Sequence, residues 1–323
     1  MGELRMKKIL ILILLTAVVV ISGCTNQQNN TQNLACPGAG SKDGIIVTDF
    51  SFDYSPVYSG ETPGLTLEVQ NMGGETGKLL GVDVFGPEVV SSATDLQWGG
   101  KDLSKKLNEE LTPPDPTMDM PGETWSNVWT FTAPKNLATD TDYTFNTRVR
   151  YSYKTTFTAI LTIMSSNYLR SLSADKRNEL IQSGGLSQQC YSGGPLSVTG
   201  AAGTHFIDPT GEKTIRFKIE NVGTGFPYCS CTSKTCNDCG DKLDPTDTMY
   251  HVHIGTPTGT NIKDCAAPTG DIILSKGASV VFSCKFTAPK TFNNKQDITF
   301  SIPIDYDYYV DAAAPIRVQR SLK

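Results

Sequence analysis

Nine cysteines are the residues of this chain with the clearest capacity for chemistry. Four of them crowd into one short stretch, Cys229-Ser230-Cys231 and Cys236-Asn237-Asp238-Cys239. Cys24 stands apart, next to an apolar N-terminal run. The other eight form an even set, which in an exported chain is typical of structural disulfides. These eight are Cys36, Cys190, Cys229, Cys231, Cys236, Cys239, Cys265 and Cys284.

The crowded cysteines could instead hold a metal ion. Cys236-x-x-Cys239 has zinc-ribbon spacing, and the further ligands would be Cys229, Cys231, His251 and His253. However, Cys229-x-Cys231 is tighter than a usual knuckle. The two histidines alternate along one predicted strand, so they share a side that could be exposed to solvent. We therefore predict disulfides and no cofactor, with a metal-binding or electron-transfer site as the alternative.

The distribution of the cysteines favours one particular pairing. No cysteine lies between Gly44 and Met164, whereas six follow Cys190. Eight cysteines allow 105 connectivities, but if all eight are oxidised these six can pair among themselves, which leaves Cys36 for Cys190. The predicted Cys36–Cys190 disulfide closes a loop of roughly 150 residues, a constraint worth about 5 kcal/mol in the chain-entropy model.

No catalytic residue is predicted, and we expect no enzyme. Gly-x-Ser-x-Gly, His-Glu-x-x-His and phosphate-loop motifs are all missing from the sequence. The carboxylates of Asp305 and Asp307 alternate on a predicted strand, which we interpret as a solvated face rather than a calcium or glycosidase site. Tyr306, Tyr308 and Tyr309 are interpreted as core or edge packing, with contact to a sugar or a partner protein as the alternative.

Length and charge narrow the class of protein. A chain of 323 residues has room for about two domains of ~150 residues. The formal net charge is −5, and the 28 lysines and arginines form no basic run, so we expect no nucleic-acid partner. An apolar content of 38% is ordinary for a folded protein.

The N-terminus predicts export. Basic residues at Arg5, Lys7 and Lys8 precede the apolar run Ile9–Ile21, which is too short to span a bilayer comfortably and is typical of a signal peptide over 1–23. Ile21-Ser22-Gly23-Cys24 resembles the lipobox of prokaryotic lipoproteins. That resemblance implies acylation of Cys24 and a membrane anchor.

The alternative is a signal peptide cleaved nearby, or an uncleaved anchor, with Cys24 incidental. Residues 24–43 are then a flexible tether, because Thr25–Asn33 contain only Thr, Asn and Gln.

A long duplication dominates the rest of the chain. Phe131–Lys135 recurs as Phe286–Lys290, and Asp142–Tyr153 recurs as Asp297–Tyr308, 155 residues later in each case. Apolar residues keep a period of two in both copies, with Phe145 opposite Phe300. One face of each segment is therefore expected to be buried in a sheet.

Further strands belong to each copy. Leu65–Gly73 and Ile215–Gly223 alternate in polarity and end in Asn-x-Gly, which predicts a half-buried strand followed by a turn. This order, with the long Tyr143–Tyr153 strand, resembles CARDB, the cell-adhesion-related modules of archaea and bacteria. The resemblance implies immunoglobulin-like β-sandwiches outside the cytoplasm, with an archaeal origin favoured. The acidic closing segment of that family is missing, and both copies carry long insertions, 89–121 and 226–275.

The predicted fold class is all-β, with two tandem immunoglobulin-like sandwiches. The predicted domains are 44–165 and 190–323, the second with a Cys-rich insertion. Helical spacing between Asn167 and Ser183 predicts a short helical linker over 166–189. Lys101–Leu111 is a second helical candidate.

The sequence therefore favours a non-catalytic surface lipoprotein that serves adhesion, envelope structure or binding. Its expected partners are the membrane, through the lipid, and a surface protein or glycan. The alternative is a membrane-tethered metal-binding or electron-transfer protein that uses the Cys229–Cys239 loop with His251 and His253. A solute-binding lipoprotein is a weaker third hypothesis, because that class has α/β lobes.

Overall fold

The computed structural model describes residues 41–182, 185–202, 212–228, 249–259, 262–265, 270–289 and 294–321. All of them belong to the second of two compact units, Leu34–Lys323. Strands make up most of this part of the chain, and its sheets are almost entirely antiparallel. The predicted all-β, immunoglobulin-like sandwich class is therefore confirmed.

One nine-stranded sheet runs through the described unit. Its order is β16-β14-β18-β9-β4-β7, with β10 paired to β9, and with β13 and β2 paired to β18. The strands are β2 (Val57–Tyr58), β4 (Gly77–Phe85), β7 (Ser104–Leu111), β9 (Thr141–Met164), β10 (Leu186–Tyr191), β13 (Phe226–Pro227), β14 (His251–Ile254), β16 (Asp271–Ile273) and β18 (Lys295–Gln319).

Two smaller sheets complete the two halves of the unit, and a short ribbon joins parts of the first insertion. The first half holds β1 (Ile45–Phe52), β3 (Gly64–Asn71) and β8 (Thr124–Thr130), in the order β1-β3-β8. The second half holds β11 (Leu196–Ala201), β12 (Glu212–Asn221), β17 (Ser279–Thr287) and β15 (Ile262–Lys263), in that order. The ribbon is the parallel pair of β5 (Val89–Val90) and β6 (Trp98–Gly99).

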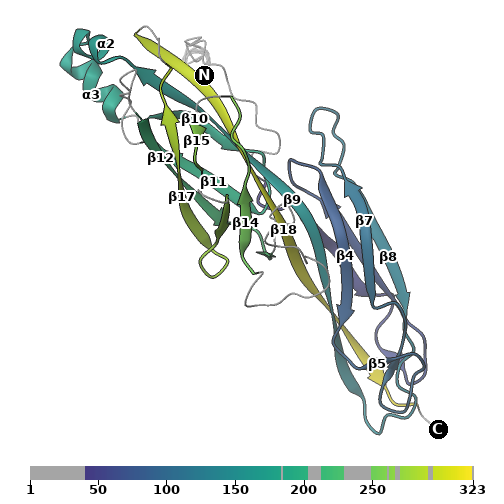
Figure 1. Ribbon diagram of the computed structural model, residues 1–323. Helices are drawn as coiled ribbons and strands as arrows, with labels where there is room; N and C mark the ends of the chain where they lie inside the picture. The colour runs from purple at the N-terminus through teal and green to yellow at the C-terminus, as the bar shows by residue number, and fades with distance from the viewer. Residues whose placement is uncertain are drawn as a thin grey trace, which may run out of the picture. The chain divides into compact units, whose positions relative to one another are not determined.

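The long strands β9 and β18 connect both halves. They pair without interruption from Thr141 opposite Val318 to Met164 opposite Lys295, and Figure 1 shows them side by side. The N-terminal part of each long strand lies in the repeat to which the strand belongs, and its C-terminal part extends into the other repeat. The sheet thus crosses the predicted boundary between 44–165 and 190–323, and that division into domains stays a prediction.

Each half has an aromatic core on the strand face that the period-two pattern predicted. The ring of Phe145 lies 5.2 Å from Phe52, 5.1 Å from Trp98 and 4.8 Å from Phe131. At the equivalent position of the second repeat, Phe300 lies 6.1 Å from Phe157. Both phenylalanines are buried, Phe145 to 0% and Phe300 to 1% exposure. Burial of a side chain of this size contributes about 1.5–3 kcal/mol.

The Asn-x-Gly turns are held in the same way in both halves. Asn71 Nδ2 donates to Glu75 O at 2.8 Å, and Glu75 N donates to the Tyr153 hydroxyl at 3.1 Å. In the second repeat Asn221 Nδ2 donates to Gly225 O at 2.9 Å, and Gly225 N donates to the Tyr308 hydroxyl at 3.1 Å. Each turn is therefore fixed to a tyrosine of its own long strand.

The predicted linker 166–189 contains two short helices where one was expected, and its last residues belong to β10, whereas the helix predicted in the first insertion is wrong. The linker contains α2 (Ser166–Ser171), capped by Ser165, and α3 (Ala174–Gln182). Lys101–Leu111 is not a helix, because β7 occupies Ser104–Leu111 and pairs with β4 along its length. Cross-strand pairing with an existing sheet outweighs the helix propensity of the Leu, Lys and Glu residues in this segment, because tertiary contacts routinely override propensity. Within the described ranges, neither helix is long and apolar enough to cross a membrane.

Candidate functional site

The structure places three of the nine cysteines. Cys265 and Cys284 form a disulfide with Cα atoms 4.1 Å apart, which links the chain after β15 to β17. Cys190, on β10, is also disulfide-bonded. The remaining cysteines lie outside the described residues, so the lipid on Cys24 and the Cys36–Cys190 pairing stay predictions. These are Cys24, Cys36, Cys229, Cys231, Cys236 and Cys239.

The two histidines of the metal alternative lie where the sequence predicted, at alternate positions of β14. Both are half-buried, and His253 Nδ1 lies 2.8 Å from Asp271 Oδ1 of β16. Among the residues that the structure describes, no three His, Cys, Asp or Glu side chains are grouped so that they could hold a metal ion. The Cys229–Cys239 loop lies outside those residues, so the metal alternative stays a prediction.

The carboxylates of β18 are less exposed than the sequence suggested. Asp305 is half-buried beside Lys154, with 3.7 Å between carboxylate and ammonium. Asp307 is only 2% exposed and accepts a hydrogen bond from the Ser152 hydroxyl. The predicted solvated face is thus wrong at Asp307. Tyr228 N donates to the backbone carbonyl of Asp307 at 2.9 Å, so the chain after β13 runs beside this strand.

The tyrosines of the two long strands are core residues, as the packing interpretation predicted. Tyr306 and Tyr308 are buried to 2% and 0% exposure, and Tyr309 is also buried. On the neighbouring strand β9, Tyr151 lies beside Tyr308 with ring centroids 5.6 Å apart, and Tyr153 lies beside Tyr306 with ring centroids 6.2 Å apart. Burial raises the pKa of the Tyr151 and Tyr306 hydroxyls well above the usual value. These hydroxyls therefore stay neutral and serve packing.

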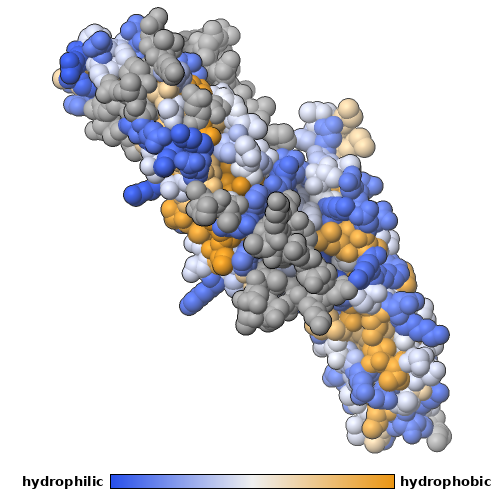
Figure 2. Space-filling model, viewed as in Figure 1, coloured by the Kyte–Doolittle hydropathy of each residue, from blue (hydrophilic) through white to orange (hydrophobic). Residues whose placement is uncertain are grey.

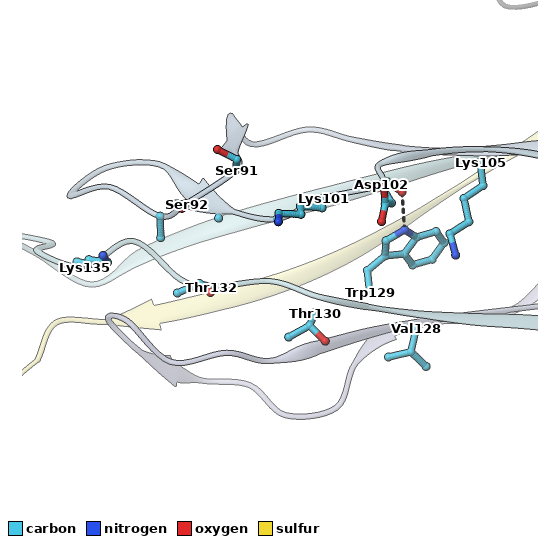
Figure 3. A pocket seen from close by; sticks show the side chains of 13 residues that line it. Ser91, Ser92, Lys101, Asp102, Lys105, Val128, Trp129, Thr130, Thr132 and Lys135 are labelled. Carbon is cyan, nitrogen blue, oxygen red and sulfur yellow. Dashed lines mark hydrogen bonds between the residues drawn. The ribbon is translucent and has the colours of Figure 1, made fainter.

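A polar cleft in the first half is the candidate site that sequence reasoning missed. It has a volume of about 510 Å³, within the range of ligand pockets, and lies between β8 and the insertion that contains β5 and β6 (Figure 3). Its polar lining is Ser91, Ser92, Lys101, Asp102, Lys105, Thr130, Thr132 and Lys135.

One wall of the cleft is held rigidly. The Trp129 indole N–H donates to the backbone carbonyl of Asp102 at 2.9 Å, which ties the insertion to β8 (Figure 3). Lys105 Nζ donates to Asn127 Oδ1 at 2.6 Å and lies 5.7 Å from the centre of the Trp129 ring. Trp129 is 4% exposed, so it supports the wall and offers no free stacking face to a ligand.

The charge of the cleft is opposite in sign to that of the chain. Three lysines and one aspartate line it, whereas the whole chain has a formal net charge of −5. Within the described residues, Lys101, Lys105 and Lys135 form no ion pair. Three ammonium groups with hydroxyls nearby favour an anionic ligand.

The repeat contains a signal that points to this cleft. Trp129 stands where the second repeat has Cys284, and the lysines at 101 and 105 lie in the first insertion, which has no close counterpart. Departures from the duplicated pattern thus mark Lys101, Lys105 and Trp129, whereas Thr132 and Lys135 belong to the repeated Phe-Thr-Ala-Pro-Lys motif.

Comparisons with known proteins identify no family. No protein-family model and no curated protein matches the chain. Among solved structures, red sea bream transglutaminase matches with 9% identity and a TM-score of 0.20, over 88% of this chain and 32% of that one, so this chain spans about a third of its length. The resemblance to CARDB stays a prediction.

Two further structures match at a similar level. The type II cohesin dyad of the ScaA scaffoldin from Acetivibrio cellulolyticus shows 10% identity and a TM-score of 0.18, over 82% of this chain and 85% of that one. The CupB6 tip adhesin from Pseudomonas aeruginosa shows 7% identity and a TM-score of 0.17, over 89% of this chain and 100% of that one. Similarity this low supports no conclusion about what the chain binds.

Proposed function

We propose that this chain is a non-catalytic binding module, held by a lipid on Cys24 at the outer side of a membrane. The observation that carries the binding role is the cleft beside β8, which Lys101, Lys105 and Lys135 line without a described ion-pair partner. Its ligand is a surface polymer or protein that carries negative charge. A surface position brings such ligands within reach, and the part of the predicted tether before Cys36 gives the folded unit freedom to meet them.

The disulfides support the outer location. Cys265 and Cys284 are bonded to each other and Cys190 is bonded as well. Structural disulfides are typical of oxidising compartments and rare in the cytosol of most organisms. The apolar run Ile9–Ile21, which shortly precedes Cys24, supports export.

Membrane fractionation tests the anchor. Cys24→Ser should leave the protein as an unprocessed precursor or release it into the soluble fraction, whereas Thr25→Ser should stay processed and bound. A Cys24→Ser chain that is still processed and bound to the membrane would show that the lipid is not the anchor.

Capture of envelope fragments tests the binding role. The full chain, immobilised in detergent, should retain fragments from its own source organism, and the double variant Lys101→Glu/Lys135→Glu should not. The matched control is Lys42→Glu/Lys276→Glu, which changes the net charge equally at exposed positions outside the cleft. Equal retention by the two double variants would rule out the cleft as the binding site.

A further inference from the structure

The outward-facing backbone groups of β8 can be identified from the hydrogen bonds at its two ends. Asn71 N donates to Glu123 O at 3.1 Å, and Phe131 N donates to Pro63 O at 3.1 Å. Backbone groups of successive strand residues point to opposite sides, so the odd-numbered residues of β8 bond to β3 and the even-numbered ones face away. Thr132 fits this alternation, because it exchanges two hydrogen bonds with Gly99 on the side away from β3.

Ser126, Val128 and Thr130 therefore direct their backbone N–H and C=O groups to the outer edge of the sheet. β8 is the last strand in the order β1-β3-β8, and no strand in the described part of the chain pairs with that edge. The Val128 side chain is 61% exposed there, and Figure 2 shows other apolar side chains at the surface among hydrophilic ones. An open edge of this kind is a template for a further strand.

The insertion keeps this edge open. After pairing with Thr132 through Gly99, the chain turns away at Gly100 and Lys101, and Asp102 takes a positive φ of 57°. The bond from Trp129 to the Asp102 carbonyl then holds the departing segment beside β8. The space between them is the cleft, with Val128 and Thr130 on one side and Lys101 and Lys105 on the other (Figure 3).

We propose that this cleft takes an extended acidic segment of a partner protein, which adds to β8 as a fourth strand. The inference rests on the proposed function, since it names the ligand of the same cleft. Main-chain bonds to Val128 and Thr130 provide affinity, and carboxylates of the segment lie near Lys101, Lys105 and Lys135. A peptide fits better than a glycan, because only a peptide presents N–H and C=O groups at the spacing of the open edge.

Protection of the edge is the simpler explanation for these lysines. Exposed charges on edge strands prevent pairing between copies of a protein. That explanation predicts no saturable binding of any peptide, so a binding measurement separates the two.

The direct test uses the full chain in detergent and a short, acetylated, fluorescent peptide that alternates glutamate and valine. Fluorescence anisotropy should show saturable binding that weakens strongly at about 1 M salt, where charges are screened within about 3 Å. The same peptide with lysine in place of glutamate should not bind. A glutamate peptide that fails to bind would overturn the inference but not the envelope-binding role, which the capture experiment tests on its own.

Val128→Pro tests the strand addition. Proline removes the outward-facing N–H at position 128, and it leaves the bonds between β8 and β3 intact. Peptide affinity should fall about tenfold or more, in line with the loss of a main-chain hydrogen bond and of strand geometry. Val128→Thr keeps the N–H and should bind as the native chain does. Tryptophan fluorescence and the melting temperature of both variants report whether the fold is intact.

A second probe keeps the inference testable if Val128→Pro does not fold. The glutamate peptide is N-methylated at every other residue. This preserves its charge but removes the backbone N–H donors along one side of the extended peptide. Much weaker binding of this peptide supports strand addition, and equal binding overturns it. A sulfated oligosaccharide that binds the native chain in place of the peptide, and is lost in Lys101→Glu/Lys135→Glu, would identify an anionic glycan site and overturn the peptide proposal.

Discussion

Ser152 lies directly opposite Asp307 in the antiparallel pair of β9 and β18, and the Ser152 hydroxyl donates a hydrogen bond to the Asp307 carboxylate. The two residues are equivalent in the internal duplication, 155 positions apart. When equivalent residues of two antiparallel strands face each other, the repeats are related by a pseudo-two-fold axis at that point. Each repeat therefore contributes the far end of its longest strand to the other.

This exchange of strand ends predicts that the first half does not fold alone. A fragment of residues 41–165 lacks Val310–Val318, the part of β18 that pairs with Thr141–Val149. All three tryptophans of the chain lie at 98, 125 and 129, so their fluorescence reports on this half. We expect the fragment to show no cooperative unfolding in urea, and we expect the same fragment linked flexibly to residues 307–321 to show it. Cooperative unfolding of the bare fragment, with native-like fluorescence, would contradict the exchange.

The two aromatic cores predict similar losses of stability on truncation. Phe145→Ala and Phe300→Ala should each lower the free energy of unfolding by about 3–5 kcal/mol, because each leaves a cavity among aromatic rings. Val281→Ala is the matched control, since that side chain is 63% exposed and its loss should change stability by less than about 0.5 kcal/mol. Denaturant unfolding measures all three. An unchanged midpoint in both phenylalanine variants would place these residues outside the core.

The period-two pattern was enough to predict which face of each long strand is buried, because that pattern depends only on strand geometry. It was not enough to predict that Tyr151 pairs with Tyr308 and Tyr153 with Tyr306, since register depends on contacts distant in sequence. The cleft was missed for a similar reason. Lys101 and Lys135 line one cleft because Gly99 pairs with Thr132, and no local pattern encodes that bridge.

The buried tyrosines predict loss of stability at alkaline pH. Burial is the main cause that raises the pKa of Tyr151, Tyr153, Tyr306 and Tyr308 above the usual value of about 10. Above about pH 10 the unfolded chain releases these protons while the folded chain keeps them, so the unfolded state binds fewer protons. The free energy of unfolding should therefore be fully retained below pH 10 and fall as the pH rises toward the folded-state pKa values.

Denaturant unfolding at a series of pH values, with tyrosinate absorbance as a second readout, checks this expectation. Tyr308→Phe should reduce the alkaline slope, although it also removes the bond from the Tyr308 hydroxyl to Asn221 Oδ1 and so lowers stability at neutral pH. Tyr58→Phe, at an exposed position, is the control. A stability that does not fall above pH 10 would show that the four hydroxyls titrate alike in both states.

The predicted Cys36–Cys190 disulfide would link the segments that precede the two repeats. Cys190 is bonded, and the other two described cysteines are bonded to each other, so the partner of Cys190 is one of the remaining six. Gly194 N donates to Ser41 O at 3.2 Å, which brings the chain shortly after Cys190 beside the chain shortly after Cys36. This contact favours Cys36 over the cysteines of the Cys229–Cys239 loop.

Peptide mapping without reduction should recover Cys36 and Cys190 in one cross-linked peptide. Cys36→Ser/Cys190→Ser should then lower the free energy of unfolding by up to about 5 kcal/mol, because the crosslink closes a loop of roughly 150 residues in the unfolded chain. The Cys265–Cys284 disulfide closes a much shorter loop, of sequence separation 19. In the same model, Cys265→Ser/Cys284→Ser should therefore lower the free energy of unfolding by less. A Cys36 peptide recovered with a free thiol, or joined to the Cys229–Cys239 loop, would show that this disulfide does not link the segments that precede the two repeats.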